Sequence, residues 1–291
     1  MMRDISQLLV SGLATGAVYA IIALGFNVVY KATRVLNFAH GEYLVICGIL
    51  ASVLTRQLGW PFAATALVVI VVGVGLGLGT ELIVFTFLRK PDPLTMAIGA
   101  IAVAVILQAV VLTVTGGKNY GLDSWPGASF NIGSQRVEAQ LMWNVGLAVL
   151  LTFALRVFFT STRTGIALQA AADDRATASL YGVSPRSTAM WSFALAGALG
   201  AVGGMAVAPL SLMAFHMGLL LGLKGFTAAV LGGLGSMPGA LIGGLTIGIL
   251  EAAVSTYVSG TAAPFAAFVV LLVVLFVRPT GIFKSQEVQR V

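Results

Sequence analysis

Charged residues are scarce in this chain, at 9% of its 291 residues, while hydrophobic residues make up 58%. Soluble domains carry about 25% charged residues, and the core of a water-soluble protein could not bury this apolar excess. The composition therefore excludes an ordinary soluble domain. It predicts an all-α, polytopic integral membrane protein in which residues 1–291 form a single transmembrane domain.

Cysteine, histidine and nucleotide-binding motifs are also nearly absent. The one cysteine, Cys47, excludes an internal disulfide, and it is not clustered with either histidine, which excludes the usual kinds of metal site. The sequence has no G-x-x-x-x-G-K-[ST] motif and no nucleophile elbow, so we expect neither enzymatic activity nor a bound cofactor. Its basic residues lie at the ends of apolar segments without interleaved aromatics, which favours contact with lipid over nucleic acid.

Long apolar runs fill most of the chain and predict about eight to nine transmembrane helices. A further apolar stretch, 210–233, is broken by glycines and by Lys224, which is typical of a short, bent or re-entrant segment. If it crosses, there are nine spans; if it only dips in, there are eight. The continuous predicted spans are Leu8–Tyr30, Phe38–Thr55, Pro61–Phe87, Leu94–Thr115, Leu141–Thr160, Thr188–Ala208, Ala240–Val258 and Ala263–Val277.

The cations decide the orientation, because loops on the cytoplasmic side carry the excess of Lys and Arg. With the polar stretch 156–187 placed inside and 210–233 crossing, 11 of the 16 cations fall inside, including the C-terminal ones. We therefore predict an external N-terminus and a cytoplasmic C-terminus. The cations predicted to lie outside are Arg3, Arg56, Lys118, Arg136 and Lys224.

Two loops stand out under this arrangement. Residues 116–140 form an external loop rich in turn residues, for which we expect a small cap or hairpin. Residues 161–187 form a cytoplasmic coupling loop containing an alanine-rich helix, with Thr164 as its N-cap and Gly182 just past its end. We expect this helix to contact a cytoplasmic partner, the alternative being a helix resting on lipid. The predicted contact residues are Thr164, Ala170, Asp173, Asp174, Arg175 and Gly182.

Polar residues inside predicted spans are candidates for a solute path, since ionisable groups are costly in hydrocarbon. The alternative is that each one bonds a neighbouring helix. A glycine-rich stretch between two apolar runs also predicts a tight turn or hinge. The path candidates are Asn37, His40, Glu42, Glu81, Gln108 and Glu251, and the hinge candidates are Gly232, Gly233, Gly235, Pro238 and Gly239.

With these features laid out, the chain resembles the LivH-type permeases of branched-chain amino acid ABC importers over essentially its whole length. The family pattern usually has alanine where Gly225 stands, which is a small departure. The segments that carry the resemblance are Leu36–Glu42, Thr164–Val183, Leu223–Ser236 and Arg278–Phe283.

The resemblance implies a multi-pass permease subunit of the bacterial inner membrane that couples solute uptake to ATP hydrolysis by alternating access. It implies as partners a second homologous permease, two cytoplasmic ATPase subunits that bind ATP and Mg²⁺, and an extracytoplasmic solute-binding protein. Related importers carry urea, short amides or aromatic acids, so the solute stays open. The competing class is an ion-coupled secondary transporter or channel that uses Glu42, Glu81 and Glu251.

Overall fold

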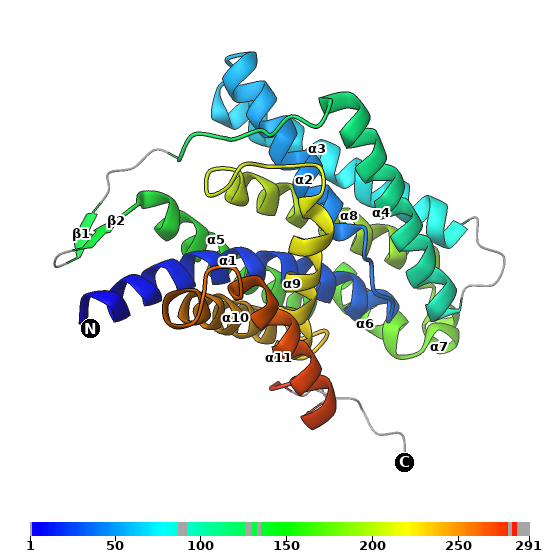
Figure 1. The fold of residues 1–291 in the computed structure, drawn as a ribbon. Helices are drawn as coiled ribbons and strands as arrows, with labels where there is room; N and C mark the ends of the chain where they lie inside the picture. Colours follow the sequence, from blue (N-terminus) through cyan, green and yellow to red (C-terminus); the bar gives the residue numbers. More distant parts are fainter. Residues whose placement is uncertain (1, 87–91, 126–129, 133–134, 279–280, 284–291) are drawn as a thin grey trace.

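The computed structural model describes residues 2–86, 92–125, 130–132, 135–278 and 281–283, and these are almost entirely helical (Figure 1). The first half of the chain contains α1 (Met2–Thr33), α2 (His40–Ser52), η1 (Val53–Gln57), α3 (Phe62–Glu81), η2 (Leu82–Thr86) and α4 (Pro93–Thr115). The second half contains β1 (Phe130–Ile132), β2 (Gln135–Val137), α5 (Ala139–Ser161), α6 (Arg163–Asp173), α7 (Arg175–Leu180), α8 (Pro185–Val207), α9 (Met217–Gly232), α10 (Met237–Tyr257) and α11 (Ala263–Val277).

Six of the described helices are long and apolar enough to cross a membrane, namely those in α1, α3, α4, α5, α8 and α10. Helices α9 and α11 are apolar but shorter, and α2 continues directly into the π-helical turns of η1. The predicted all-α membrane fold is confirmed, with each predicted span matched by a helix. The expected hairpin is also present, as the antiparallel pair of β1 and β2.

Several helices begin with a side-chain cap followed by proline, a sequence pattern that sets where each span starts. Asp92 accepts a hydrogen bond from the Thr95 backbone N–H before Pro93 opens α4, and its bonds with Thr95 lower the pKa of the Asp92 carboxyl. Ser184 caps α8 in the same way, ahead of Pro185. These caps satisfy N–H groups that would otherwise have no partner within the helix.

Helix α1 lies at the centre and packs against α5, α8, α9 and α10 (Figure 1). Its contact with α10 is made by glycines: a Cβ at Gly16 would lie 2.8 Å from the Leu245 Cα, and one at Gly248 would lie 2.3 Å from the Gly16 Cα. A second glycine of α10, Gly243, meets the Ala228 carbonyl of α9 in the same way. Small residues allow this approach, and close packing is what holds helices together in lipid.

Contacts between loops show which of them lie at the same end of the bundle. At one end, Arg34 pairs with Asp173, which joins the α1–α2 connection to α6. At the other end, the Tyr120 N–H donates to the Met213 carbonyl over 3.0 Å, and Arg56 forms an ion pair with Asp123. This grouping agrees with the alternation predicted from the cations, in which Arg34 is inside and Arg56 outside.

Helix α9 runs from one end of the bundle to the other. The connection before it contacts the Tyr120 end, and the turn after it contacts α1 close to the Arg34 end. Its 16 residues span about 24 Å, which is shorter than a hydrocarbon core of about 30 Å. The structure therefore favours the crossing arrangement, with α9 as a short span.

Candidate functional site

The predicted coupling loop contains two helices, α6 and α7, which corrects the prediction of a single one. Thr162, rather than Thr164, caps α6 by accepting a hydrogen bond from the Gly165 N–H. Asp174 then interrupts the helix, because its carboxylate accepts from the N–H groups of Ala176 and Thr177 and starts α7. Alanine content predicted helix correctly, but a capping side chain in mid-segment offered the backbone a better ending.

Helix α6 is anchored on the end of α5. Leu168 is fully buried, and Gly165 lies so close that a Cβ there would be 2.1 Å from the Phe158 carbonyl oxygen. The Gln169 amide donates to the Phe159 carbonyl over 2.5 Å. Helix α6 is therefore packed directly against the end of a long apolar helix.

A surface ion pair ties α6 to a second part of the bundle as well. The Arg34 guanidinium lies 3.3 Å from the Asp173 carboxylate, and the Lys31 ammonium lies 5.0 Å from the centre of the Phe159 ring. Arg34 has a φ of +60°, an unusual backbone conformation for a residue other than glycine. Asp173 thus has a defined partner on the α1–α2 connection.

The tip of this α6–α7 unit is apolar and exposed. Leu180 and Tyr181, at the end of α7, are 86% and 85% exposed. The predicted role of Gly182 in ending the helix agrees with its φ of +81°. Beside the tip, a recess of about 360 Å³ lies between α6, Gly182 and the start of α8, with Thr164 on its wall. Ala170 is exposed, and the side chain of Arg175 lies outside the described part of the structure.

The glycine-rich turn between α9 and α10 is held by a buried asparagine of α1. The Asn27 amide donates to the Ser236 carbonyl over 2.8 Å and accepts from the Gly235 N–H over 3.0 Å. Gly233 and Gly235 have φ of +99° and +84°, which glycine adopts without steric cost. Ser236 caps α10 by accepting from the Gly239 N–H. The predicted turn is present, and its movement stays a prediction.

The C-terminal segment Gly281–Phe283 closes the end of α9 beside this turn. The Ile282 N–H donates to the Leu231 carbonyl over 2.8 Å, and the Phe283 N–H donates to the Gly232 carbonyl over 3.2 Å. Gly281 packs against Gly233: a Cβ at Gly281 would lie 2.5 Å from the Gly233 backbone nitrogen. These contacts place the chain's C-terminal part at the end of the bundle where α9 finishes, as the predicted topology requires.

Three path candidates, Asn37, His40 and Glu42, lie together where α2 begins. The Asn37 amide donates to the Tyr43 hydroxyl over 3.1 Å, and its carbonyl oxygen accepts from the Ala39 N–H. The His40 ring is 1% exposed, and its centre lies 5.4 Å from that of Phe26. The His40 ring also faces the backbone of Ile22 in α1.

Glu42 lies in a tight seam between α2 and α9. A Cβ at Gly218 would lie 2.4 Å from the Glu42 carboxyl carbon, and one at Gly41 would lie 2.0 Å from the Gly218 carbonyl oxygen. The Glu42 Oε2 atom is buried and has no hydrogen-bond partner in the described part of the chain. The seam holds α2 and α9 close around one carboxyl oxygen that the described residues leave unsatisfied.

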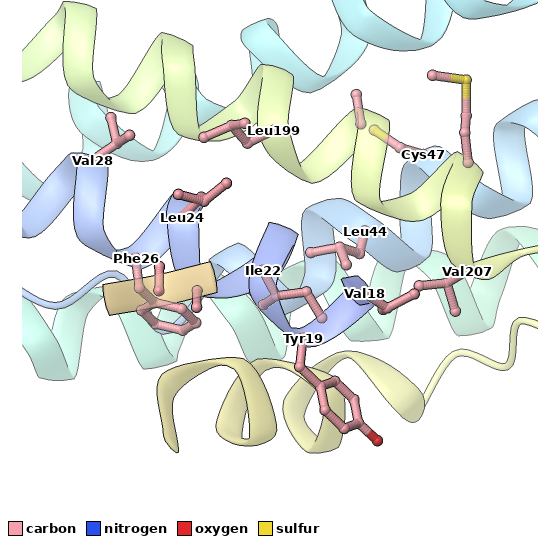
Figure 2. Close-up of a cluster of buried hydrophobic side chains, with 14 of the residues drawn as sticks. Val18, Tyr19, Ile22, Leu24, Phe26, Val28, Leu44, Cys47, Leu199 and Val207 are labelled. Carbon is pink, nitrogen blue, oxygen red and sulfur yellow. The ribbon is translucent and has the colours of Figure 1, made fainter. Parts of the chain in front are cut away.

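The sixth path candidate, Glu251, belongs to a separate buried group. The Lys224 ammonium lies 2.5 Å from Glu251 Oε1, and the Tyr19 hydroxyl donates to Glu251 Oε2 over 2.6 Å. Lys224 also donates to the Tyr19 oxygen over 3.0 Å. This triad of Tyr19, Lys224 and Glu251 joins α1, α9 and α10. Figure 2 shows the Tyr19 ring pointing away from the apolar side chains that surround Leu24.

Lys224 corrects one sequence-based interpretation, its assignment to the outside set of cations. The structure buries Lys224 within α9 and pairs it with Glu251. The available signal was one cation and one acid in neighbouring apolar runs, which is costly in lipid unless the two meet. Tyr19 gives no such signal, because tyrosine is common in apolar runs.

The other two path candidates lie apart from both groups. Glu81 is buried at the end of α3, and Gln108 is half-buried on α4. Helix α4 packs mainly against α2 and η2, at the edge of the bundle. The six predicted residues thus form one cluster at the start of α2, one member of the triad, and two positions, on α3 and α4, that belong to neither group.

Comparison with known proteins gives consistent results. Residues 8–278 match the family described as "Branched-chain amino acid transport system / permease component". The chain is 33% identical to the high-affinity branched-chain amino acid transport system permease protein LivH of Escherichia coli (strain K12), covering 98% of this chain and 97% of the relative. It is 32% identical to BraD, the corresponding permease protein of Pseudomonas aeruginosa, over the same shares of the two chains.

Among solved structures, PsaBC from Streptococcus pneumoniae in complex with Fab is similar with a TM-score of 0.49 and 15% identity, covering 93% of this chain and 91% of that one. A likeness of this size supports no argument about the present chain.

Proposed function

The chain belongs to the family of permease components of branched-chain amino acid transport systems, and from this premise we propose that it is the permease subunit of an ABC importer for branched-chain or related amino acids. It is a multi-pass inner-membrane protein and works by alternating access. Its partners are a second homologous permease, two cytoplasmic ATPases that bind ATP and Mg²⁺, and an extracytoplasmic solute-binding protein.

The structure of the α6–α7 unit is the observation that supports the coupling role. It presents an exposed apolar tip, Leu180–Tyr181, on a base fixed to α5 and to the α1–α2 connection. Exposed apolar side chains beside a recess are typical of a protein contact. A partner that moves this tip would move α5 and α1 together, which is the transmission that an ATP-driven permease needs.

The site's other features support alternating access. The α9–α10 turn contains two glycines at positive φ, and the α2–α9 seam encloses a carboxyl oxygen of Glu42 that has no partner among the described residues. A seam that opens would offer this carboxyl group to solute and water. Ion-coupled transport remains the rival mechanism, and uptake of urea, short amides or aromatic acids remains the rival specificity.

The test is reconstitution of the chain with its partner subunits in proteoliposomes. We expect uptake of leucine, isoleucine or valine that requires ATP and the binding protein and is unaffected by ionophores. Uptake driven by an ion gradient without ATP would overturn the proposal in favour of the secondary transporter.

The coupling role has its own variant. Leu180→Asp with Tyr181→Asp should abolish ATPase association and uptake without lowering abundance, since both side chains are exposed. The matched control is Leu212→Asp, 61% exposed in the connection at the opposite end of the bundle. Equal effects of the two changes would contradict the coupling role.

A further inference from the structure

A polar recess opens at the end of the bundle where α1 begins and α10 ends. Its volume is about 340 Å³, and its walls come from α1, the last turns of α10 and the start of α11. The polar side chains on its walls are Ser11, Thr15, Glu251, Ser255 and Thr256. Glu251 therefore belongs both to this recess and to the triad with Tyr19 and Lys224.

The hydroxyl groups in the recess act mainly as acceptors. Ser11 donates its proton to the Leu8 carbonyl, Thr15 donates to the Ser11 carbonyl, and Thr256 donates to the Ala252 carbonyl. A hydroxyl whose proton is used in this way still offers lone pairs. With the Glu251 carboxylate beside them, these oxygens suit a positively charged group with several N–H donors, such as a primary ammonium.

The triad supplies the opposite charge next to the recess. The side chains of Lys224 and Glu251 are 10% and 14% exposed. A buried ion pair is often no more stable than apolar side chains of similar volume, so stability alone does not explain why the chain keeps one between α9 and α10, beside Tyr19 of α1. Ionisable groups inside a membrane protein generally mark a substrate or ion pathway.

We propose that the triad and the recess form a binding site for the head group of a zwitterionic α-amino acid. The solute's ammonium binds Glu251 and the hydroxyl oxygens, and its carboxylate accepts from Lys224 and the Tyr19 hydroxyl. Without solute, Lys224 and Glu251 neutralise each other; with solute, each exchanges that partner for the opposite charge of the zwitterion. Neither charge is ever left bare, which is the condition for holding a zwitterion within a membrane.

The rest of the recess suits an aliphatic solute. Gly248, Ala252, Ala263 and Pro264 complete its walls with small apolar surfaces. The site thus pairs a charged end with an apolar end, as leucine or valine does. This inference rests on the proposed function and names residues that would recognise the solute within it.

The main test uses the complete importer with its ATPases and binding protein. The charge-swapped variant Lys224→Glu/Glu251→Lys and the neutral variant Lys224→Met/Glu251→Met both avoid a lone buried charge. We expect both to insert normally and to lose leucine uptake by about tenfold or more, because neither variant offers the solute's two charges their proposed partners. A tenfold loss corresponds to about 1.4 kcal/mol. Uptake at the normal rate by either inserted variant would show that the pair is only structural.

A matched pair of threonines provides a second test that does not disturb the ion pair. Thr256 and Thr246 are both exposed on α10, and both donate to the carbonyl four residues earlier, but only Thr256 lines the recess. Thr256→Val should lower leucine uptake several-fold, and Thr246→Val should leave it unchanged. Equal behaviour of the two variants would overturn the assignment of the recess.

Direct binding separates this inference from the proposed function. In the purified permease–ATPase complex without binding protein, leucine should raise the thermal unfolding temperature, because a ligand that binds only the folded state stabilises it. Isopentylamine and 4-methylpentanoate, which each lack one charge, should not. If all three compounds stabilise equally, the zwitterion site is wrong, whereas transport by the importer is left untouched by that result. If the intact wild-type importer moves no amino acid with ATP, it is the proposed function that fails.

Discussion

Two buried polar groups of this bundle, the triad and the cluster at the start of α2, differ in whether their polar atoms have hydrogen-bond partners. In the triad, Lys224 and both Glu251 oxygens have partners within hydrogen-bond distance. At the start of α2, the buried Oε2 atom of Glu42 has none among the described residues. A buried polar group without a partner costs free energy, whereas a satisfied network makes one conformation rigid. The difference suggests that the triad fixes this conformation and that the α2 cluster favours leaving it.

The largest loss of stability should come from removing only one of the two charges of the triad. Lys224→Met leaves the Glu251 carboxylate buried without its cation, which costs about 3–5 kcal/mol in soluble proteins. The double variant Lys224→Met/Glu251→Met removes both charges and should recover most of that loss. Thermal unfolding of the purified chain measures both. Equal unfolding temperatures for the single and double variants would mean that the ion pair is not coupled.

A smaller loss of stability is expected from removing the two hydrogen bonds by which Asn27 holds the α9–α10 turn. Asn27→Leu keeps the volume but leaves the Gly235 N–H and the Ser236 carbonyl without their partner. Each buried group left unsatisfied costs about 1–3 kcal/mol. Ser236→Ala is the control, because it keeps the backbone carbonyl and loses only the cap of α10. If Ser236→Ala unfolds at a lower temperature than Asn27→Leu, the hydrogen bonds of Asn27 contribute less to stability than their geometry indicates.

The spans of this fold could be predicted from sequence because hydrocarbon allows so few alternatives. A chain that must satisfy its own backbone in lipid forms helices wherever apolar runs are long enough, and Pro93 and Pro185 mark where two of them start. The weakest prediction was the α6–α7 unit. It lies in a polar segment, where the local bonds of Asp174 outweigh the helix propensity of the alanines around it.

The candidate site was predicted only in part, for a physical reason. A single sequence identifies polar residues in apolar runs but not which of them meet, because the contacts join positions as distant as Tyr19 and Glu251. The same applies to Asn27, whose partners are backbone atoms of a turn more than 200 residues away. Lys224 was misplaced because a broken apolar stretch hides the depth at which its cation lies.

Removing a polar group from the α2 cluster should have the opposite effect on stability to removing one from the triad. Glu42→Met removes a carboxyl group that has an unpartnered oxygen and keeps a similar shape over Gly218. Replacing an unsatisfied polar group with an apolar one is close to neutral or stabilising, so the unfolding temperature should stay the same or rise while uptake falls. The control in the same cluster is Tyr43→Phe, which deprives the Asn37 amide of its acceptor and should lower the unfolding temperature. A clear loss of stability in Glu42→Met would mean that both carboxylate oxygens are in fact satisfied.

The smallest effect on stability, and the clearest separation of stability from coupling, is expected at the surface pair of Arg34 and Asp173. Their side chains are 39% and 65% exposed, and exposed ion pairs contribute only about 0.2–1 kcal/mol. Asp173→Asn should therefore leave the unfolding temperature nearly unchanged. The pair nevertheless joins α6 to the α1–α2 connection, so its loss should reduce the ATP hydrolysis that the loaded binding protein stimulates. Arg56 and Asp123 are the matched control, an ion pair 3.5 Å apart at the opposite end of the bundle with side chains 52% and 76% exposed. Asp123→Asn removes a comparable surface bond without touching the α6–α7 unit, and it should leave stimulated hydrolysis intact. If both variants lower hydrolysis equally, or neither does, then the Arg34–Asp173 pair has no special part in coupling and α6 acts through its packing on α5 alone.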